Sequence, residues 1–128
     1  RAEAAAGLER AVAWLARAHP GHRLRVLDAL RPQRVQEAIW RDVAGTPAAH
    51  YFAEPGHGSI HSFGMAVDVT LLEIEQLACG AITAAHIAAR EMLRDAMAAG
   101  GFAGIATEWW HFNFGDPEHV RREYPRVL

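Results

Sequence analysis

The chain has 128 residues, of which 51% are hydrophobic, so its length and composition are those of a single globular domain. Its 13 basic and 15 acidic residues give a net charge of -2, which argues against a nucleic-acid partner because phosphate binding needs a surplus of Lys and Arg. No apolar run approaches the roughly 20 residues of a membrane span, and one cysteine excludes both an intramolecular disulfide and a thiolate metal cage.

We therefore expect one soluble domain over residues 1–128 that binds any metal ion through histidines and carboxylates. No basic and apolar leader opens the chain, which favours a cytoplasmic protein. The periplasm is the alternative, because a trimmed start would hide a signal peptide.

The first half of the chain predicts two helices separated by a short strand. Residues 3–18 have apolar side chains at helical spacing, and residues 23–29 alternate as a strand does. Pro32 opens a second helix, and residues 48–58 form a loop because they contain Pro and Gly and have little periodicity. The residues expected to face the core from the two helices are Leu8, Val12, Leu15, Val35, Ile39 and Val43.

The second half predicts a strand from Met65, a helix over residues 81–99 and a last strand over residues 107–114. In the strand from Met65, large apolar residues alternate with small or polar ones, so Asp68 lies on the face opposite the large apolar groups. This order of elements favours an α+β fold, in which helices pack against a small, mostly antiparallel sheet.

Two segments concentrate side chains that bind metal ions. The first runs from Ser59 to Asp68 and places His61 just before a glycine turn; the second is Glu108 to His111. Two imidazoles and one carboxylate suit a catalytic Zn²⁺, because three protein ligands leave a fourth position open. The alternative for each segment taken alone is a capping or hydrogen-bonding role.

The same segments offer groups for hydrolysis. Glu108 is the candidate base that takes a proton from water, but in a regular strand it would point away from His111 three residues later. It must therefore lie at the strand's entrance or on a bulge. Arg31 is the candidate partner of an oxyanion or a substrate carboxylate, and its alternative is a structural ion pair.

The other candidate residues favour structural roles. His57, four residues before His61, is the one competitor as a ligand. His86 is expected to be buried and hydrogen-bonded, and Cys79 to act as a small hydrophobe. Trp109 and Trp110 are expected to form core and pocket wall.

These segments resemble the M15 metallopeptidases. Residues 59–68 are similar to their SxHxxGxAxD motif, and residues 108–111 to their ExxH segment in its EWWH form. Residues 28–33 resemble the DAYRP segment of the D-alanyl-D-alanine dipeptidases of the VanX type. Leu30 and Phe63 depart from the usual residues at their positions, and the connection after the Asp68 strand is shorter than is usual in the family.

The resemblance implies one Zn²⁺ per chain, with His61, Asp68 and His111 as ligands. It also implies that Glu108 is the general base and Arg31 the arginine that stabilises the transition state. The implied reaction is hydrolysis of a small D,D-dipeptide, D-Ala-D-Ala, to two amino acids. The residues expected to contact the substrate are Ser59, Ser62 and Trp110.

Two other functions stay open at this stage. One is a D,D-carboxypeptidase that acts on peptidoglycan stem peptides, which a more open site after a short connection would favour. The other is a zinc-binding module without catalysis, which the presence of both Glu108 and Arg31 disfavours.

Overall fold

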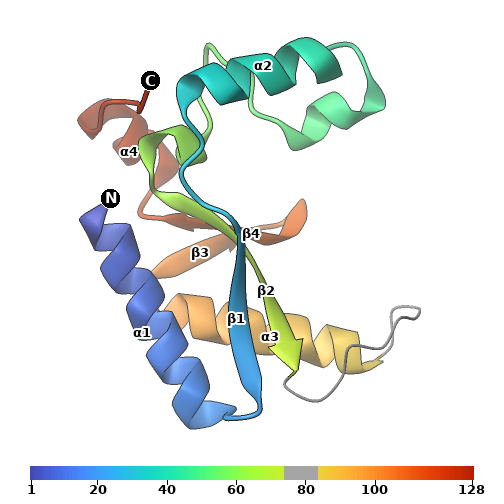
Figure 1. The fold of residues 1–128 in the computed structure, drawn as a ribbon, viewed down its shortest axis with the longest axis vertical. Coiled ribbons are helices and arrows are strands. Elements are labelled where there is room, and N and C mark those ends of the chain that lie inside the picture. Colours follow the sequence, from blue (N-terminus) through green and yellow to red (C-terminus); the bar gives the residue numbers. More distant parts are fainter. Residues whose placement is uncertain (74–83) are drawn as a thin grey trace.

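The computed structural model describes residues 1–73 and 84–128 as a four-stranded antiparallel sheet flanked by helices (Figure 1). The strand order is β1-β2-β4-β3, which confirms the predicted α+β class. The strands are β1 (His22–Asp28), β2 (Ala66–Glu73), β3 (Phe102–Ile105) and β4 (Glu108–Phe114). The helices are α1 (Ala2–Ala18), α2 (Gln33–Val43), α3 (Ala84–Ala99) and α4 (Pro117–Glu123), with 3₁₀ turns η1 (Pro47–Tyr51) and η2 (Ile60–Phe63).

The core lies between the sheet and helices α1 and α3; in Figure 1, α3 passes behind β1 and β2, and α1 runs beside them. Val69 of β2 and Met97 of α3 have no exposed surface, and Leu93 and Phe112 are almost as deeply buried. Helix α2 lies at the other end of the sheet, on the same side as α4 and away from α3 (Figure 1). Among the described residues, no helix is both long and apolar enough to cross a membrane.

Helices α1 and α3 approach so closely that glycine is required at the contact. A Cβ atom added to Gly7 would lie 2.7 Å from the Gly100 carbonyl oxygen and 2.6 Å from the ring of Phe114. Helix α1 therefore buries small residues toward α3, and the larger Val12 that the sequence predicted in the core is 47% exposed.

The apolar stripe predicted for α2 is wrong at Val35, whereas Ile39 and Val43 are half-buried. Val35 is 39% exposed, whereas Gln33 and Gln36 are buried. Helix α2 does not pack flat on the sheet, so its buried face meets polar partners: Gln33 donates to the Pro55 carbonyl oxygen, and Gln36 contacts Arg31. The helix is therefore part of the polar surroundings of Arg31 and not part of the main core.

Several further elements differ from the sequence predictions. The predicted loop over residues 48–58 contains most of η1, and β3 and α4 were not predicted. Helix α4 has a recognisable start, because Asp116 caps it by accepting from the His119 amide and Pro117 is its first residue. His86 is exposed and not buried; it lies near the start of α3 and lines a small pocket together with Leu71 and Trp109. Residues 81–83 of the predicted helix and Cys79 fall outside the described residues.

We predict that Gly7→Ala destabilises the fold by about 1–3 kcal/mol, the usual cost of overpacking a well-packed contact. Alanine is intrinsically the better helix residue by about 1 kcal/mol, but the added carbon would meet the backbone of Gly100, directly after α3, which cannot move aside cheaply. Urea unfolding of both proteins measures the difference. Gly21→Ala is the matched control, because nothing lies within 4 Å of its added carbon. A Gly7→Ala protein as stable as the parent would contradict this packing.

Candidate metal centre

The register of the sheet aligns three polar residues in one row. Asp28 of β1 pairs with Asp68 of β2, and Asp68 pairs with His111 of β4. Directly opposed residues of antiparallel strands project from the same face of the sheet. A register irregularity between Val26 and Asp28 brings Asp28 into this row.

His61 reaches the row from η2, just before β2. Gly64 ends this turn in a left-handed conformation with φ of 69°, which glycine adopts at little cost. The His61 side chain is 3% exposed, and its Nδ1 lies 2.7 Å from the carbonyl oxygen of Ala29. The Arg31 amide donates in return to the His61 carbonyl oxygen at 3.3 Å, so the segment after β1 holds the histidine from both sides.

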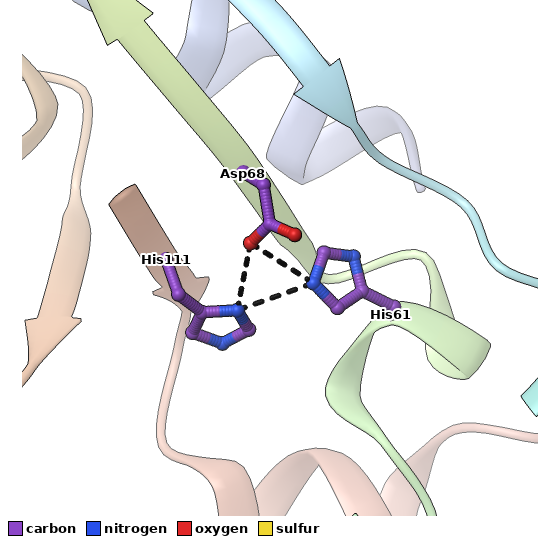
Figure 2. A group of neighbouring side chains, drawn as sticks. All are labelled: His61, Asp68 and His111. Carbon is purple, nitrogen blue, oxygen red and sulfur yellow. Dashed lines mark hydrogen bonds and ion pairs between the residues drawn. The ribbon is translucent and has the colours of Figure 1, made fainter. Parts of the chain in front are cut away.

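Three donor atoms converge on one point between β2, β4 and η2, as Figure 2 shows. Oδ1 of Asp68 lies 3.0 Å from Nδ1 of His111 and 3.3 Å from Nε2 of His61. The two ring nitrogens are 3.1 Å apart. Ligands about 2.0–2.1 Å from a tetrahedral zinc lie about 3.3 Å from one another, so the three separations are those of a ligand set.

The hydrogen bonds around the two imidazoles select the tautomers that metal binding needs. The Ala29 carbonyl oxygen accepts from Nδ1 of His61, which leaves the lone pair of Nε2 facing Asp68. Oδ1 of Asn113 lies 2.9 Å from Nε2 of His111, so a proton there leaves the lone pair of Nδ1 facing the same point. Two lone pairs and a carboxylate oxygen then meet, and a cation satisfies all three. The residues present therefore fit Zn²⁺.

The electrostatics of the group favour an ionised Asp68 and a basic His111. Burial alone would raise the pKa of Asp68, but hydrogen bonds and charge from His111 and His61 outweigh it and hold that pKa far below its usual range. Burial alone would lower the pKa of His111, yet hydrogen bonds to Asp68 and Asn113 and the nearby carboxylates raise it. The raised pKa of His111 therefore favours a proton on this ring beside the ionised Asp68.

Glu108 lies at the entrance of β4, where it can share a face with His111. Gly104 pairs with Phe112 but the next residue, Ile105, pairs with Glu108, so the ladder skips residues of β4 and forms a bulge. This is the arrangement that the spacing of Glu108 and His111 required. Burial raises the pKa of the Glu108 carboxyl, and the charge of Asp68 adds to that effect.

Arg31 lies beside the three converging side chains and is held firmly in place. Its Nε and one terminal nitrogen donate to Oδ2 of Asp28 at 2.9 and 2.5 Å, and the other terminal nitrogen donates to Gln36 at 3.0 Å. Its guanidinium is also 3.8 Å from Oδ2 of Asp68. Arg31 thus has the structural ion pair that was its alternative role, and it also lines the site.

A cavity of about 560 Å³ opens over these groups. Ser62 is not on its wall: this residue has no exposed surface, so its predicted substrate contact has no support from the geometry. His57, the competing ligand, is exposed and lies outside both the metal-binding group and the cavity wall. The predicted site residues that do line the cavity are Arg31, Ser59, His61, Asp68, Glu108, Trp110 and His111.

Sequence reasoning missed several polar residues of this cavity, among them Asn113 and Arg121. Asn113 had a signal, because it lies two residues after His111 in the same strand and so shares its face. Arg121 had none, because the helix that carries it was not predicted.

A His-Asp-His group that can hold a metal ion on an antiparallel sheet, with a carboxylate on the same cavity wall, has the groups that metal-dependent hydrolysis needs. A family model of the M15 peptidases, described as D-ala-D-ala dipeptidase, matches residues 55–128. A D-alanyl-D-alanine dipeptidase of Escherichia coli (strain K12) is 33% identical over 109 residues. The chain belongs to the M15 peptidase family. The match covers 72% of this chain and 55% of that relative, so the chain spans about half the relative's length.

Solved structures of peptidases share the fold at low sequence identity. The L,D-carboxypeptidase DacB from Streptococcus pneumonia is 19% identical with a TM-score of 0.58, over 95% of this chain and 69% of that one. VanYB in complex with D-alanine-D-alanine is 20% identical with a TM-score of 0.59, over 93% and 73%. A variant of the D,D-pentapeptidase VanY in complex with Zn(II) is 20% identical with a TM-score of 0.58, over 93% and 74%.

We predict that His61→Ala abolishes stoichiometric zinc binding, because it removes one of three converging donors and leaves Asp68 and His111 as an incomplete set. Metal analysis of the dialysed protein and titration calorimetry measure the loss. His57→Ala is the matched control and should keep one zinc per chain, since His57 is exposed and outside the group. Loss of zinc in His57→Ala with retention in His61→Ala would reverse the assignment.

We also predict that zinc affinity falls as the pH falls through the raised pKa of His111, which lies above its usual 6.5. Zinc must displace the proton that His111 holds below that pKa, so the apparent affinity should drop about tenfold per pH unit there. Asp68 stays ionised over this range and adds no slope. Competition with a chromophoric chelator between about pH 8 and about pH 6 measures it. An affinity independent of pH would contradict the protonated His111.

Proposed function

We propose that this protein is a zinc-dependent D,D-dipeptidase that hydrolyses D-Ala-D-Ala to two D-alanine molecules. The observation that carries the proposal is the meeting of three ligand atoms from His61, Asp68 and His111 on the wall of a cavity that Glu108 and Arg31 also line. The choice of substrate is supported by the 33% identity to a D-alanyl-D-alanine dipeptidase.

Each polar group of the wall has a part in this hydrolysis. His61, Asp68 and His111 would hold the zinc ion, which would supply Lewis-acid polarisation of the scissile carbonyl and would lower the pKa of the attacking water. Glu108 accepts the proton of the attacking water and delivers it to the departing amine, and its raised pKa suits both transfers. Arg31 places a permanent positive charge beside the oxyanion that develops, and its bonds to Asp28 and Gln36 orient it before the reaction begins.

The second candidate is a D,D-carboxypeptidase acting on peptidoglycan stem peptides. The size of the cavity favours it, because about 560 Å³ is within the range of pockets for ligands larger than a dipeptide of alanine. A longer peptide would extend along the exposed aromatic side chain of Tyr51, which lines the same cavity. The chemistry at the metal centre would be the same in both enzymes.

A substrate panel tests the proposal and separates the two candidates. The zinc-loaded protein is incubated with D-Ala-D-Ala, with L-Ala-L-Ala and with a pentapeptide that ends in D-Ala-D-Ala, and the products are separated by chromatography. Release of D-alanine from the D,D-dipeptide in preference to the pentapeptide supports the dipeptidase. Cleavage mainly of the pentapeptide would establish the carboxypeptidase instead, and stoichiometric zinc without any hydrolysis would leave a binding module.

We predict that Glu108→Gln keeps one zinc per chain and lowers kcat by about 10²–10⁴-fold, the usual contribution of a positioned general base. The amide retains the shape of the side chain but cannot accept the proton of water. Zinc content and kcat are measured on the same preparation. Glu91→Gln, an exposed position on α3, is the matched control and should leave both unchanged. Normal turnover would rule out Glu108 as the base, and loss of zinc would make it a ligand.

A further inference from the structure

The cavity over the metal centre has a second cationic residue whose role the proposed reaction leaves unassigned. Among the described residues of its wall, the basic side chains besides histidines are Arg31 and Arg121, and the acidic ones are Asp68 and Glu108. Asp68 belongs to the metal centre and Glu108 is the proposed base. Neither carboxylate is therefore available to balance the positive charges of the two arginines when a substrate is bound.

The positive charge of Arg31 is already balanced by groups of the protein itself. Two of its nitrogens bind one carboxylate oxygen of Asp28, a third binds Gln36, and Asp68 lies 3.8 Å away. Its side chain is 14% exposed, so water screens these interactions only weakly. A further anion that binds directly to Arg31 would have to compete with Asp28.

Arg121 lines the same cavity, and its positive charge is balanced far less than that of Arg31. It is on α4, where Pro117, one helical turn earlier on the same face, also lines the cavity. Its partner Glu118 lies 2.5 Å away but is 66% exposed, so water screens this pair and its net contribution is small. A second terminal nitrogen is 3.4 Å from the Gly58 carbonyl oxygen, and its buried Nε has no acceptor among the described residues.

We propose that Arg121 binds the free C-terminal carboxylate of the peptide substrate, an inference that rests on the proposed peptidase function. A guanidinium is planar and donates two parallel hydrogen bonds, which match the two oxygens of a carboxylate. Gly58, which Arg121 contacts, precedes Ser59 of the cavity wall, so the arginine is linked to the segment that leads to His61. A dipeptide and a stem peptide both end in such a carboxylate.

This assignment makes the enzyme one that cleaves the last peptide bond of its substrate. The carboxylate would be held at the α4 wall while the adjacent peptide bond lies over the metal centre, with Arg31 at the oxyanion. A peptide that continues beyond the scissile residue offers no carboxylate to Arg121 and would leave this largely buried guanidinium with only the exposed Glu118 as an anionic partner, which is costly. The site would therefore select against internal peptide bonds.

The test compares D-Ala-D-Ala with its C-terminal amide, which has the same scissile bond and no carboxylate. The zinc-loaded parent protein should prefer the free acid in kcat/KM. Arg121→Gln should lower kcat/KM for the acid by about 10–100-fold, mainly through KM, because a hydrogen-bonded ion pair is lost. It should leave the amide nearly unchanged, so the preference collapses. Arg121→Lys keeps the charge but not the paired donors. Its preference for the acid should therefore lie between that of the parent and that of Arg121→Gln.

Two control variants separate substrate binding from a structural role of Arg121. Arg122→Gln removes an exposed charge from the same helix and should keep the full preference for the acid. Glu118→Gln breaks the ion pair with Arg121 but leaves the guanidinium in the cavity, so it should keep the preference as well. Zinc content and the midpoint of thermal unfolding, measured for every variant, show whether the fold and the metal centre are intact.

The outcomes distinguish this inference from the proposed function. If Arg121→Gln still prefers the acid as the parent does, Arg121 does not bind the carboxylate, although the protein is a peptidase. Equal cleavage of acid and amide by the parent would also overturn the inference. If the zinc-loaded parent cleaves no D,D-peptide at all, the proposed function itself fails and the inference fails with it.

Discussion

The pairing register of the three strands β1, β2 and β4 is the constraint on which the metal centre rests. It sets Asp28, Asp68 and His111 in one row on one face of the sheet. A shift of one residue in β2 would turn Asp68 into the core and bring an apolar side chain to the site, since neighbours in a strand point to opposite faces. The buried Val67 and Val69 on either side of Asp68 oppose such a shift, so the packing of the core also holds the ligand in place.

The polar groups of the site hold one another before any ligand binds. Ala29 orients the ring of His61 through its carbonyl oxygen, and Asn113 orients the ring of His111. Asp28 and Gln36 hold Arg31 beside Asp68. Converging lone pairs and a buried carboxylate cost free energy without a cation between them, and the rigid sheet keeps them together despite that cost.

Helix α2 shows how this polar site changes an ordinary packing rule. Its apolar stripe suggested a helix that packs on the core, yet Gln36 is the residue with no exposed surface. Gln36 accepts from Arg31 and donates to the Ala53 carbonyl oxygen at 2.7 Å, so both ends of the amide are satisfied. The helix thereby connects Arg31 to the loop at Ala53 on the cavity wall, and a hydrophobic residue at position 36 could not make that connection.

Local patterns were sufficient to predict the α+β class, the face of Asp68 and the displaced entrance position of Glu108, because side-chain direction follows from the period of each element. Motif spacing also selected His61, Asp68 and His111 as the residues that the fold brings together. Distances between segments remote in sequence were decided only by the tertiary structure. The close approach of α1 to α3 turned Val12 outward, and the unpredicted α4 carried Arg121 to the cavity wall. Local periodicity carries no information on such contacts, because it records which face of an element is apolar and not which partner will cover it.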